Sequence, residues 1–146
     1  MNKFWGHLKT ITHHRHLVMR GCFRMGLIWQ GLTHDLSKYS PTKFLAGVRY
    51  YQGDRSPNTA EREANGYSLA WMHHKGRNKH HFEYWTDLSP KTRTYEPVDM
   101  PVRYLCEMVA DRIAACKTYQ GAAYTDASPL QYLDRANESR LVHPQT

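Results

Sequence analysis

Glycine and proline residues divide this chain into segments in which apolar residues recur every three or four positions. Few segments alternate apolar and polar residues in the way that a half-buried strand does. The pattern predicts helices over about 5–25, 28–36, 41–51, 58–74, 80–85, 101–121 and 128–136. A chain of 146 residues is long enough for one hydrophobic core. We therefore expect an all-α fold, a single domain over residues 1–146 built as a bundle of about five to seven helices.

Two of the expected helices carry a polar side chain on an apolar stripe. In the first helix, His14 lies one turn before Val18 on the face that should be buried. In the helix 101–121, Asp111 lies on or beside the stripe that contains Val109. A carboxylate that faces a core destabilises the fold unless it is paired or bound to a metal ion. Both polar residues are therefore candidates for a buried site.

A third stripe runs through the segment 58–74. It consists of Ala60, Ala64, Tyr67, Trp71 and His74, which follow one another at intervals of four, three, four and three positions. This spacing predicts one continuous helix with His74 on its buried side, and Asn58 followed by Glu61 resembles a capping box at its start. The segment 86–100 is polar and contains two prolines, so it predicts a long surface connection, which could serve as a lid.

Histidine is unusually frequent, with ten residues, and seven of them form three clusters: His13, His14 and His16; His73 and His74; His80 and His81. Another histidine stands beside a carboxylate, as His34–Asp35, with Lys38 three residues further on. Nitrogen and carboxylate ligands from separate helices suit a divalent transition metal. The sequence therefore predicts a site for one or two metal ions, with the candidate ligands His14, His34, Asp35, His73, His74, His80, His81 and Asp111.

Each candidate has a purely structural alternative. His14 alone could be a hydrogen-bonded core histidine, and Asp111 could pair with Arg112 or Lys117. The sequence does not decide between His73 and His74, or between His80 and His81. The remaining histidines, His7, His13, His16 and His143, are expected in solvent. The basic run after His74 is either an ordinary solvated loop or a phosphate contact made by Lys75, Arg77, Asn78 and Lys79.

The formal charge of +7 favours anionic partners, such as a phosphorylated metabolite, a nucleotide or, more weakly because the basic residues are dispersed, a nucleic acid. No apolar run approaches the roughly 18 residues of a membrane span, and no secretory signal is evident. None of the three cysteines forms a Cys-x-x-Cys motif, which favours free thiols over one disulfide and a spare thiol. We therefore expect a cytoplasmic protein that does not contact membranes.

The order of these ligands along the chain resembles the HD-domain superfamily of metal-dependent phosphohydrolases, whose pattern is His, His-Asp and a later Asp. The additional histidines resemble its two-metal branches, among them the HD-GYP phosphodiesterases. Lys38 matches a lysine of that motif, and Val109–Ala115 matches the surroundings of the last aspartate. The Gly-Tyr-Pro signature is absent, so cleavage of cyclic dinucleotides is not implied. The resemblance implies an HD-domain-like helical bundle.

A closer resemblance covers most of the chain. It is to an uncharacterised bacterial and phage family with a His-Asp-x-Ser-Lys motif, and the matching segments here are His34–Ser40, Ala70–His74, Asn78–Trp85 and Glu107–Asp111. This resemblance implies a fold and a metal site, but it names no substrate.

The two resemblances together imply roles for the candidate residues. One ion would be held by His14, His34, Asp35 and Asp111. Asp35 would also bridge to a second ion, held by His74 with one or both of His80 and His81. The metal, whether Mn, Fe, Co, Ni, Zn or Mg, is not indicated. Asp35 and Lys38 are the expected catalytic residues, because Lys38 would neutralise phosphate oxygens. Glu107, one turn before Asp111, would orient a ligand.

The function implied is that of a metal-dependent phosphohydrolase that acts on a small phosphorylated compound or nucleotide, with a metal-activated water as the nucleophile. Two alternatives use the same residues. One is a di-iron oxygenase of the HD type. The other is a non-catalytic, metal-stabilised protein that binds a nucleotide or nucleic acid.

Overall fold

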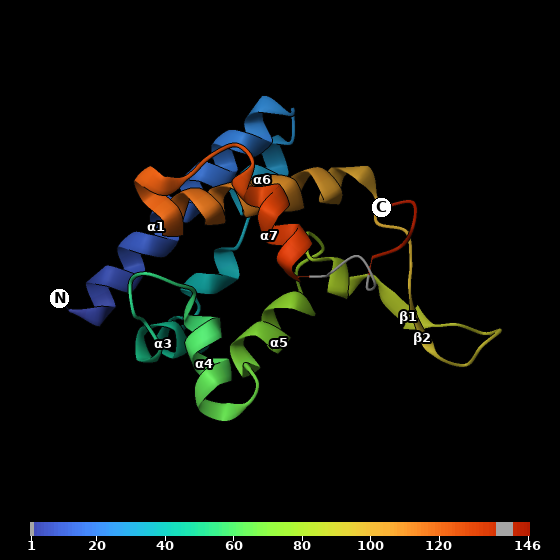
Figure 1. The fold of residues 1–146 in the computed structure, drawn as a ribbon, viewed down its shortest axis with the longest axis horizontal. Coiled ribbons are helices and arrows are strands. Elements are labelled where there is room, and N and C mark those ends of the chain that lie inside the picture. The colour runs from blue at the N-terminus through green and yellow to red at the C-terminus, as the bar shows by residue number, and fades with distance from the viewer. Residues whose placement is uncertain (1, 137–141) are drawn as a thin grey trace.

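Helices make up most of the structure, a computed structural model that describes residues 2–136 and 142–146 (Figure 1). The seven α-helices of that part are α1 (Lys3–Arg24), α2 (Ile28–Thr33), α3 (Pro41–Arg49), α4 (Pro57–Asn65), α5 (Leu69–Lys75), α6 (Val102–Gln120) and α7 (Ser128–Ala136). Three short 3₁₀ helices accompany them: η1 (Leu36–Tyr39), η2 (Phe82–Tyr84) and η3 (Gly121–Ala123). The expected all-α fold is confirmed, apart from one small hairpin. Among the described residues, no helix has the length and apolar character to cross a bilayer.

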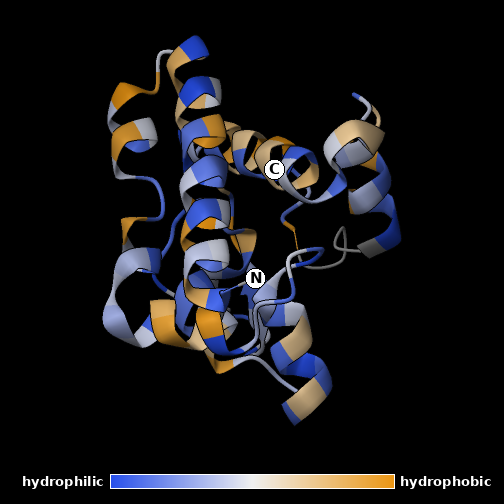
Figure 2. Ribbon diagram, turned by 90° about the vertical axis from the view of Figure 1, so that its left-hand side faces the viewer, coloured by the Kyte–Doolittle hydropathy of each residue, from blue (hydrophilic) through white to orange (hydrophobic). Residues whose placement is uncertain are grey.

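The two longest helices, α1 and α6, pack side by side (Figure 1). Between them they bury a cluster formed by Val18, Cys22, Ala110 and Ala114. The helices approach closely because α1 carries Gly21 at the contact, where an added Cβ would lie 3.1 Å from the Cβ of Ala110. Hydrophobic and hydrophilic residues alternate along the helices in Figure 2, as expected of helices with one buried side. This pairing places His14 of α1 opposite Asp111 of α6.

The segment expected to form one helix over 58–74 forms two, so that expectation is wrong. Helix α4 ends at Gly66, whose φ of 80° is left-handed and favours glycine. Helix α5 then begins after Ser68, whose side-chain oxygen accepts a hydrogen bond from the backbone N–H of Trp71 at 3.0 Å. The new helix keeps His74 on its buried side, with 4% of its surface exposed.

The start of α4 also differs from the expectation. Ser56, not Asn58, is the capping residue, because the Ser56 hydroxyl oxygen accepts a hydrogen bond from the backbone N–H of Asn58. Pro57 then occupies the first helical position, where its missing N–H has no partner to lose. The signal that identifies this start is the Ser-Pro pair.

The segment 86–100, expected to be an irregular connection, contains an antiparallel hairpin of β1 (Thr86–Leu88) and β2 (Tyr95–Pro97). Asp87 lies opposite Glu96 in this register. The hairpin projects away from the helices (Figure 1). Strands of three residues are too short to show an alternating pattern, and for that reason the sequence did not indicate them.

His7 is buried, with 6% of its surface exposed, so the expectation that it lies in solvent is wrong. Its ring packs against Phe44 of α3, with 5.2 Å between ring centroids, and against Tyr51 at 5.9 Å. Burial, reinforced by the positive charge of Lys38, lowers the pKa of His7 to about 4. The ring is therefore neutral at neutral pH and acts as a core aromatic group.

The fit of His7 against α3 depends on Gly47, and we expect Gly47→Ala to lower the free energy of unfolding by about 1–3 kcal/mol. The added Cβ would overlap the His7 ring. This overlap outweighs the gain of about 1 kcal/mol in helix propensity. Urea unfolding followed by circular dichroism measures the change. In a His7→Ala background the same substitution should no longer destabilise, and an unchanged loss there would show that another contact is responsible.

Candidate metal centre

Helices α1 and α6 supply the first two residues of the centre. The Nε2 atom of His14 lies 2.9 Å from Oδ1 of Asp111. His14 is buried, with 7% of its surface exposed. Burial, with help from the charge of Lys38, lowers the pKa of His14 despite the neighbouring carboxylates. The His14 ring is therefore neutral at neutral pH, which is the charge state of a histidine that binds a metal ion.

The chain between α2 and η1 supplies the next two residues. Asp35 has φ of 53° and ψ of 23°, a left-handed conformation that is uncommon outside glycine. With this backbone, His34 Nε2 lies 3.3 Å from Asp35 Oδ2 and 3.5 Å from Asp111 Oδ1. One donor atom from each of these residues and from His14 lies within 4.8 Å of the others. A local departure from helix thus completes a four-residue cluster.

A second group adjoins the first and shares Asp35. One donor atom from each of His74, His80 and His81 lies within 4.8 Å of the other two. Oδ1 of Asp35 is 3.3 Å from His74 Nε2 and 3.4 Å from His80 Nε2, while Oδ2 faces His34. Burial is the main reason that the pKa of His74 falls to about 2 and that of His81 to about 3. Asp35 therefore lies between two groups of buried imidazoles.

The donor atoms fit a metal ion in both chemistry and spacing. Ligand atoms about 2.1 Å from one ion lie roughly 3.0–4.2 Å from one another, which matches the separations around Asp35. Among the described residues, several buried donor atoms make no hydrogen bond of ordinary geometry, although ionisable groups lie near them: His14 Nε2, His34 Nε2, His80 Nε2, His81 Nε2 and both carboxylate oxygens of Asp35. Buried polar atoms are normally satisfied, so a convergent unsatisfied set indicates a missing partner. These clusters could hold one or more metal ions.

Glu107 stands behind two of the histidines. Its Oε1 lies 2.9 Å from Nδ1 of His34 and 3.1 Å from Nδ1 of His80. A carboxylate at Nδ1 keeps the proton on that nitrogen and leaves Nε2 facing the cluster, as in many metal sites. Burial would raise the pKa of Glu107, but the hydrogen bonds from the two imidazoles lower it. Glu107 therefore remains an anion that orients both rings.

We expect Glu107→Gln to weaken the affinity for a divalent metal ion by about 10–100-fold. Glutamine keeps the shape of the side chain but loses the charge that holds the two Nδ1–H groups. Titration of the metal-free protein with Mn²⁺ or Zn²⁺ in a calorimeter measures the affinity. Glu63→Gln is the matched control, because Glu63 is exposed, pairs with Arg55 and belongs to neither group of donor atoms. Equal affinities of wild type and Glu107→Gln would remove Glu107 from the site.

His74 is held differently from His34 and His80. Its Nδ1 lies 2.5 Å from Nζ of Lys43 and 3.1 Å from the Asn78 side-chain nitrogen, both of which can donate. These donors place the proton of the neutral ring on Nε2, which points at Asp35. Burial, with the charges of Lys38 and Arg77, lowers the pKa of Lys43 to about 8. Unlike His34 and His80, His74 therefore has hydrogen-bond donors, and not a carboxylate, at its Nδ1 atom.

Lys38 connects the centre to a pocket. Its Nζ lies 2.6 Å from Asp35 Oδ2, and 30% of its side chain is exposed. Burial disfavours the ammonium charge, but Asp35 and Asp111 outweigh this effect and raise the pKa of Lys38. The pKa of the Asp35 carboxyl, which burial would raise, is held well below its usual range chiefly by the charges of His34 and Lys38. Both groups are therefore charged at neutral pH.

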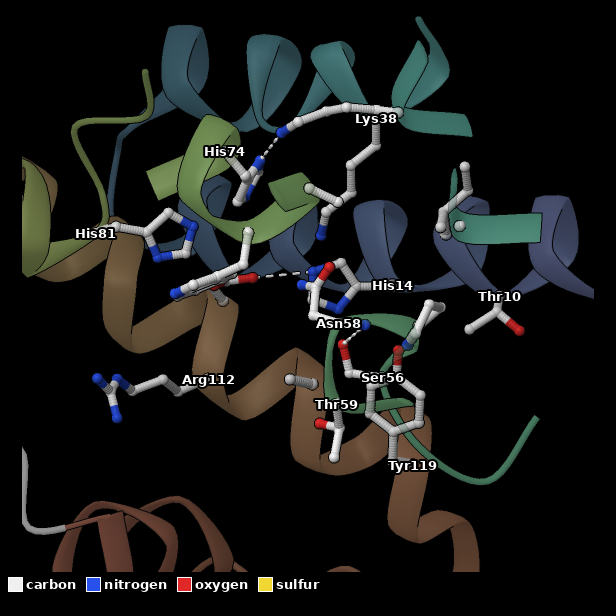
Figure 3. Close-up of a pocket in the computed structure, with 18 of the residues that line it drawn as sticks. Thr10, His14, Lys38, Ser56, Asn58, Thr59, His74, His81, Arg112 and Tyr119 are labelled. Carbon is white, nitrogen blue, oxygen red and sulfur yellow. Dashed lines mark hydrogen bonds and ion pairs between the residues drawn. The ribbon is translucent and has the colours of Figure 1, made fainter. Parts of the chain in front are cut away.

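The pocket has a volume of about 380 Å³ and reaches from the centre to the start of α4. Figure 3 shows its two ends: one is formed by His14, Lys38, His74 and His81, and the other by Ser56, Asn58, Thr59 and Tyr119. The sequence indicated none of the residues at the second end as functional. Lys43 was missed as well, because nothing in the sequence of α3 distinguishes it from a surface lysine.

Some predicted site residues lie elsewhere. The side chain of His73 is outside both clusters and contacts Arg77, with its Nδ1 2.9 Å from Nη1. Arg77, Asn78 and Lys79 line a second hollow beside the centre, not the pocket that contains Lys38. Lys75 lines neither. The structure thus brings together His14, His34, Asp35, His74, His80, His81 and Asp111, with Lys38 and Glu107 in contact with them.

Comparison with protein families finds one match over residues 3–146, to a model described as a family of unknown function, DUF5662. Neither the search of curated proteins nor the search of solved structures found a match.

Proposed function

Since the chain belongs to the DUF5662 family, whose description names no activity, we propose a function from the centre itself. The proposal is a metal-dependent phosphohydrolase that acts on a small phosphorylated compound. The observation that carries it is the convergence on Asp35 of buried histidine and carboxylate donor atoms whose spacing suits a metal ion. Next to them are a charged lysine and a pocket open to a small molecule.

Different residues would have different roles in such a reaction. His14, His34, Asp35 and Asp111 would hold one ion, and His74, His80 and His81, with Asp35, a second. A bound divalent ion would supply Lewis acidity and a nucleophile from water at neutral pH. Lys38 would neutralise oxygens of the phosphoryl group, because its ammonium is already charged at the inner end of the pocket.

The pocket supports a small substrate. Its volume of about 380 Å³ is within the range of small-molecule sites, roughly 300–1,000 Å³. The phosphoryl group would lie at the end formed by Lys38 and the histidines. The remainder of the substrate would extend toward Thr59 and Tyr119, whose hydroxyl groups can form hydrogen bonds with it.

The proposal includes membership of this protein in the HD-domain superfamily. It is supported by the order of the clustered residues along the chain, which is His14, His34–Asp35 and Asp111. It is also supported by their positions in the fold. His34 and Asp35 directly follow helix α2, whereas His14 lies on α1 and Asp111 on α6, and these two helices pack together. The histidines of the second group support a two-metal member of that superfamily.

The test is a screen of the purified protein, loaded separately with Mn, Fe, Co, Ni, Zn or Mg, on phosphomonoesters and phosphodiesters. We expect metal-dependent release of phosphate from at least one monoester, and loss of this release with a chelator. Protein that holds metal but hydrolyses none of these esters would contradict the proposal. A spin-coupled iron signal in such inactive protein would favour an oxidation at the same residues instead.

A further inference from the structure

The second hollow has a volume of about 420 Å³ and reaches the centre through residues other than those that line the pocket of Lys38. Its inner surface includes His34, Asp35, His80 and Glu107. Asp35 separates the two spaces, because it lines the hollow and contacts Lys38 and His74 of the pocket. The proposed hydrolysis places its substrate in the pocket and gives no role to the other residues that line the hollow.

Three cations surround the hollow: Arg77, Lys79 and Arg103, all exposed. Lys79 and Arg103 lie over the same ring, that of Tyr104, at 5.8 and 4.9 Å from its centroid. Within the described residues, none of the three has a carboxylate oxygen within 4.0 Å. Their charges are therefore available to an anion, and arginine in particular suits phosphate because its guanidinium group can form two parallel hydrogen bonds.

The same hollow presents an unusually exposed tryptophan. Trp29 of α2 is 73% exposed, although tryptophan is on average one of the more buried residues. In the described part of the chain Trp29 makes no ring contact, whereas Trp5 packs against Phe4 and Trp85 against Tyr104. An indole face beside cations that have no carboxylate partner is the arrangement on which nucleic acid bases stack while the cations hold the phosphates.

We propose that this hollow binds a nucleotide unit, with its phosphate on Arg77, Lys79 and Arg103 and its base stacked on Trp29. The unit is either a free nucleotide or one position of a single strand, since both present the same phosphate and base. The site is separate from the proposed hydrolytic pocket and needs no metal ion. It can therefore be tested on protein that shows no hydrolysis.

The test measures binding to the full-length, chelator-treated protein by calorimetry, with thymidine 5′-monophosphate, a short single-stranded oligothymidylate and inorganic phosphate as probes. We expect Trp29→Ala and Arg103→Ala each to weaken binding of the tighter nucleotide probe by about tenfold. Two matched controls should bind as the wild type does. Arg49→Ala removes an exposed arginine that lies over Tyr50 at 5.6 Å, and Trp5→Ala removes a tryptophan that is 63% exposed.

The affinities for the probes distinguish a free nucleotide from a position in a single strand. Comparable affinity for the mononucleotide and the oligonucleotide supports a free nucleotide, and binding of the oligonucleotide alone supports a strand. The proposal is overturned by the absence of binding, or by inorganic phosphate binding as tightly as the nucleotide. It is also overturned if Trp29→Ala and Arg103→Ala bind as well as the two controls.

Discussion

Asparagine in place of Asp35 is expected to leave a folded protein that neither retains a divalent metal ion nor hydrolyses a phosphate ester. The two carboxylate oxygens of Asp35 face both groups of histidines, so the loss of its charge affects both groups. Loss of a direct ligand should exceed the roughly 10–100-fold loss of affinity that follows removal of an outer partner. Hydrolysis should fall by on the order of 10³-fold. Elemental analysis after dialysis and the rate of phosphate release measure the two effects.

The choice of asparagine follows from the backbone. Asp35 has a φ of 53°, and asparagine tolerates this left-handed region better than alanine does. Asp35→Asn therefore removes the charge with little added strain, and its circular dichroism should match that of the wild type. Asp87→Asn, on the exposed strand β1, is the matched control. Retention of metal by Asp35→Asn, at the level of Asp87→Asn, would show that the buried clusters are not the metal site.

The sequence predicted best the parts of the centre that lie on long regular helices. His14 is buried on α1, and Asp111 lies one turn from the buried residues Met108 and Ala114 of α6, as a 3.6-residue period can indicate without tertiary information. The expected stripe of α6 was only partly right, because Val109 is 44% exposed. The same reasoning separates His73 from His74 once the start of α5 is known, because neighbouring residues point about 100° apart on a helix. His74 is buried and His73 is exposed.

The sequence could not resolve His80 and His81, because they lie outside any α-helix. Both are buried, with 3% and 8% of their surfaces exposed, and both have a donor atom in the second group. In an irregular segment the direction of each side chain depends on contacts with distant elements. The contact of His80 with Glu107, on α6, is one of these. Such contacts are not encoded in local periodicity.

A different reason explains why the sequence did not indicate the burial or role of some residues at all. His7 is buried because α3 crosses α1 at Gly47, and Lys43 matters because α3 brings it to His74. Trp29 is notable for being exposed, which a helical pattern of apolar residues does not predict. In each case the function or burial of the side chain is decided by how helices pack, and a single sequence contains no direct record of that packing.

Methionine in place of Lys38 is expected to change metal binding and turnover in opposite directions. The Lys38 ammonium lies 2.6 Å from Asp35 Oδ2, so it competes for that oxygen with a metal ion and repels the ion. Two unit charges about 4 Å apart repel by about 4 kcal/mol at an effective dielectric constant of 20, and solvent at the partly exposed side chain screens part of this. Metal affinity, measured by calorimetry, should therefore be retained or increased. Hydrolysis should fall by roughly 10²–10³-fold, because a charge that neutralises phosphate oxygens is lost.

Substitutions of two further lysines test whether hydrolysis depends on the position of the Lys38 charge or only on the total positive charge. Lys9→Met removes one positive charge from the exposed face of α1, and hydrolysis should stay at the wild-type rate. Lys43→Met removes a lysine from the same pocket, but one that contacts His74 and not Asp35, so its effect on hydrolysis should be smaller than that of Lys38→Met. Should Lys38→Met lose metal and activity in parallel, Lys38 would serve to hold Asp35 in place. Its assignment to the phosphate would then be wrong, because a residue that acts on the substrate alone cannot lower the metal content of the free protein.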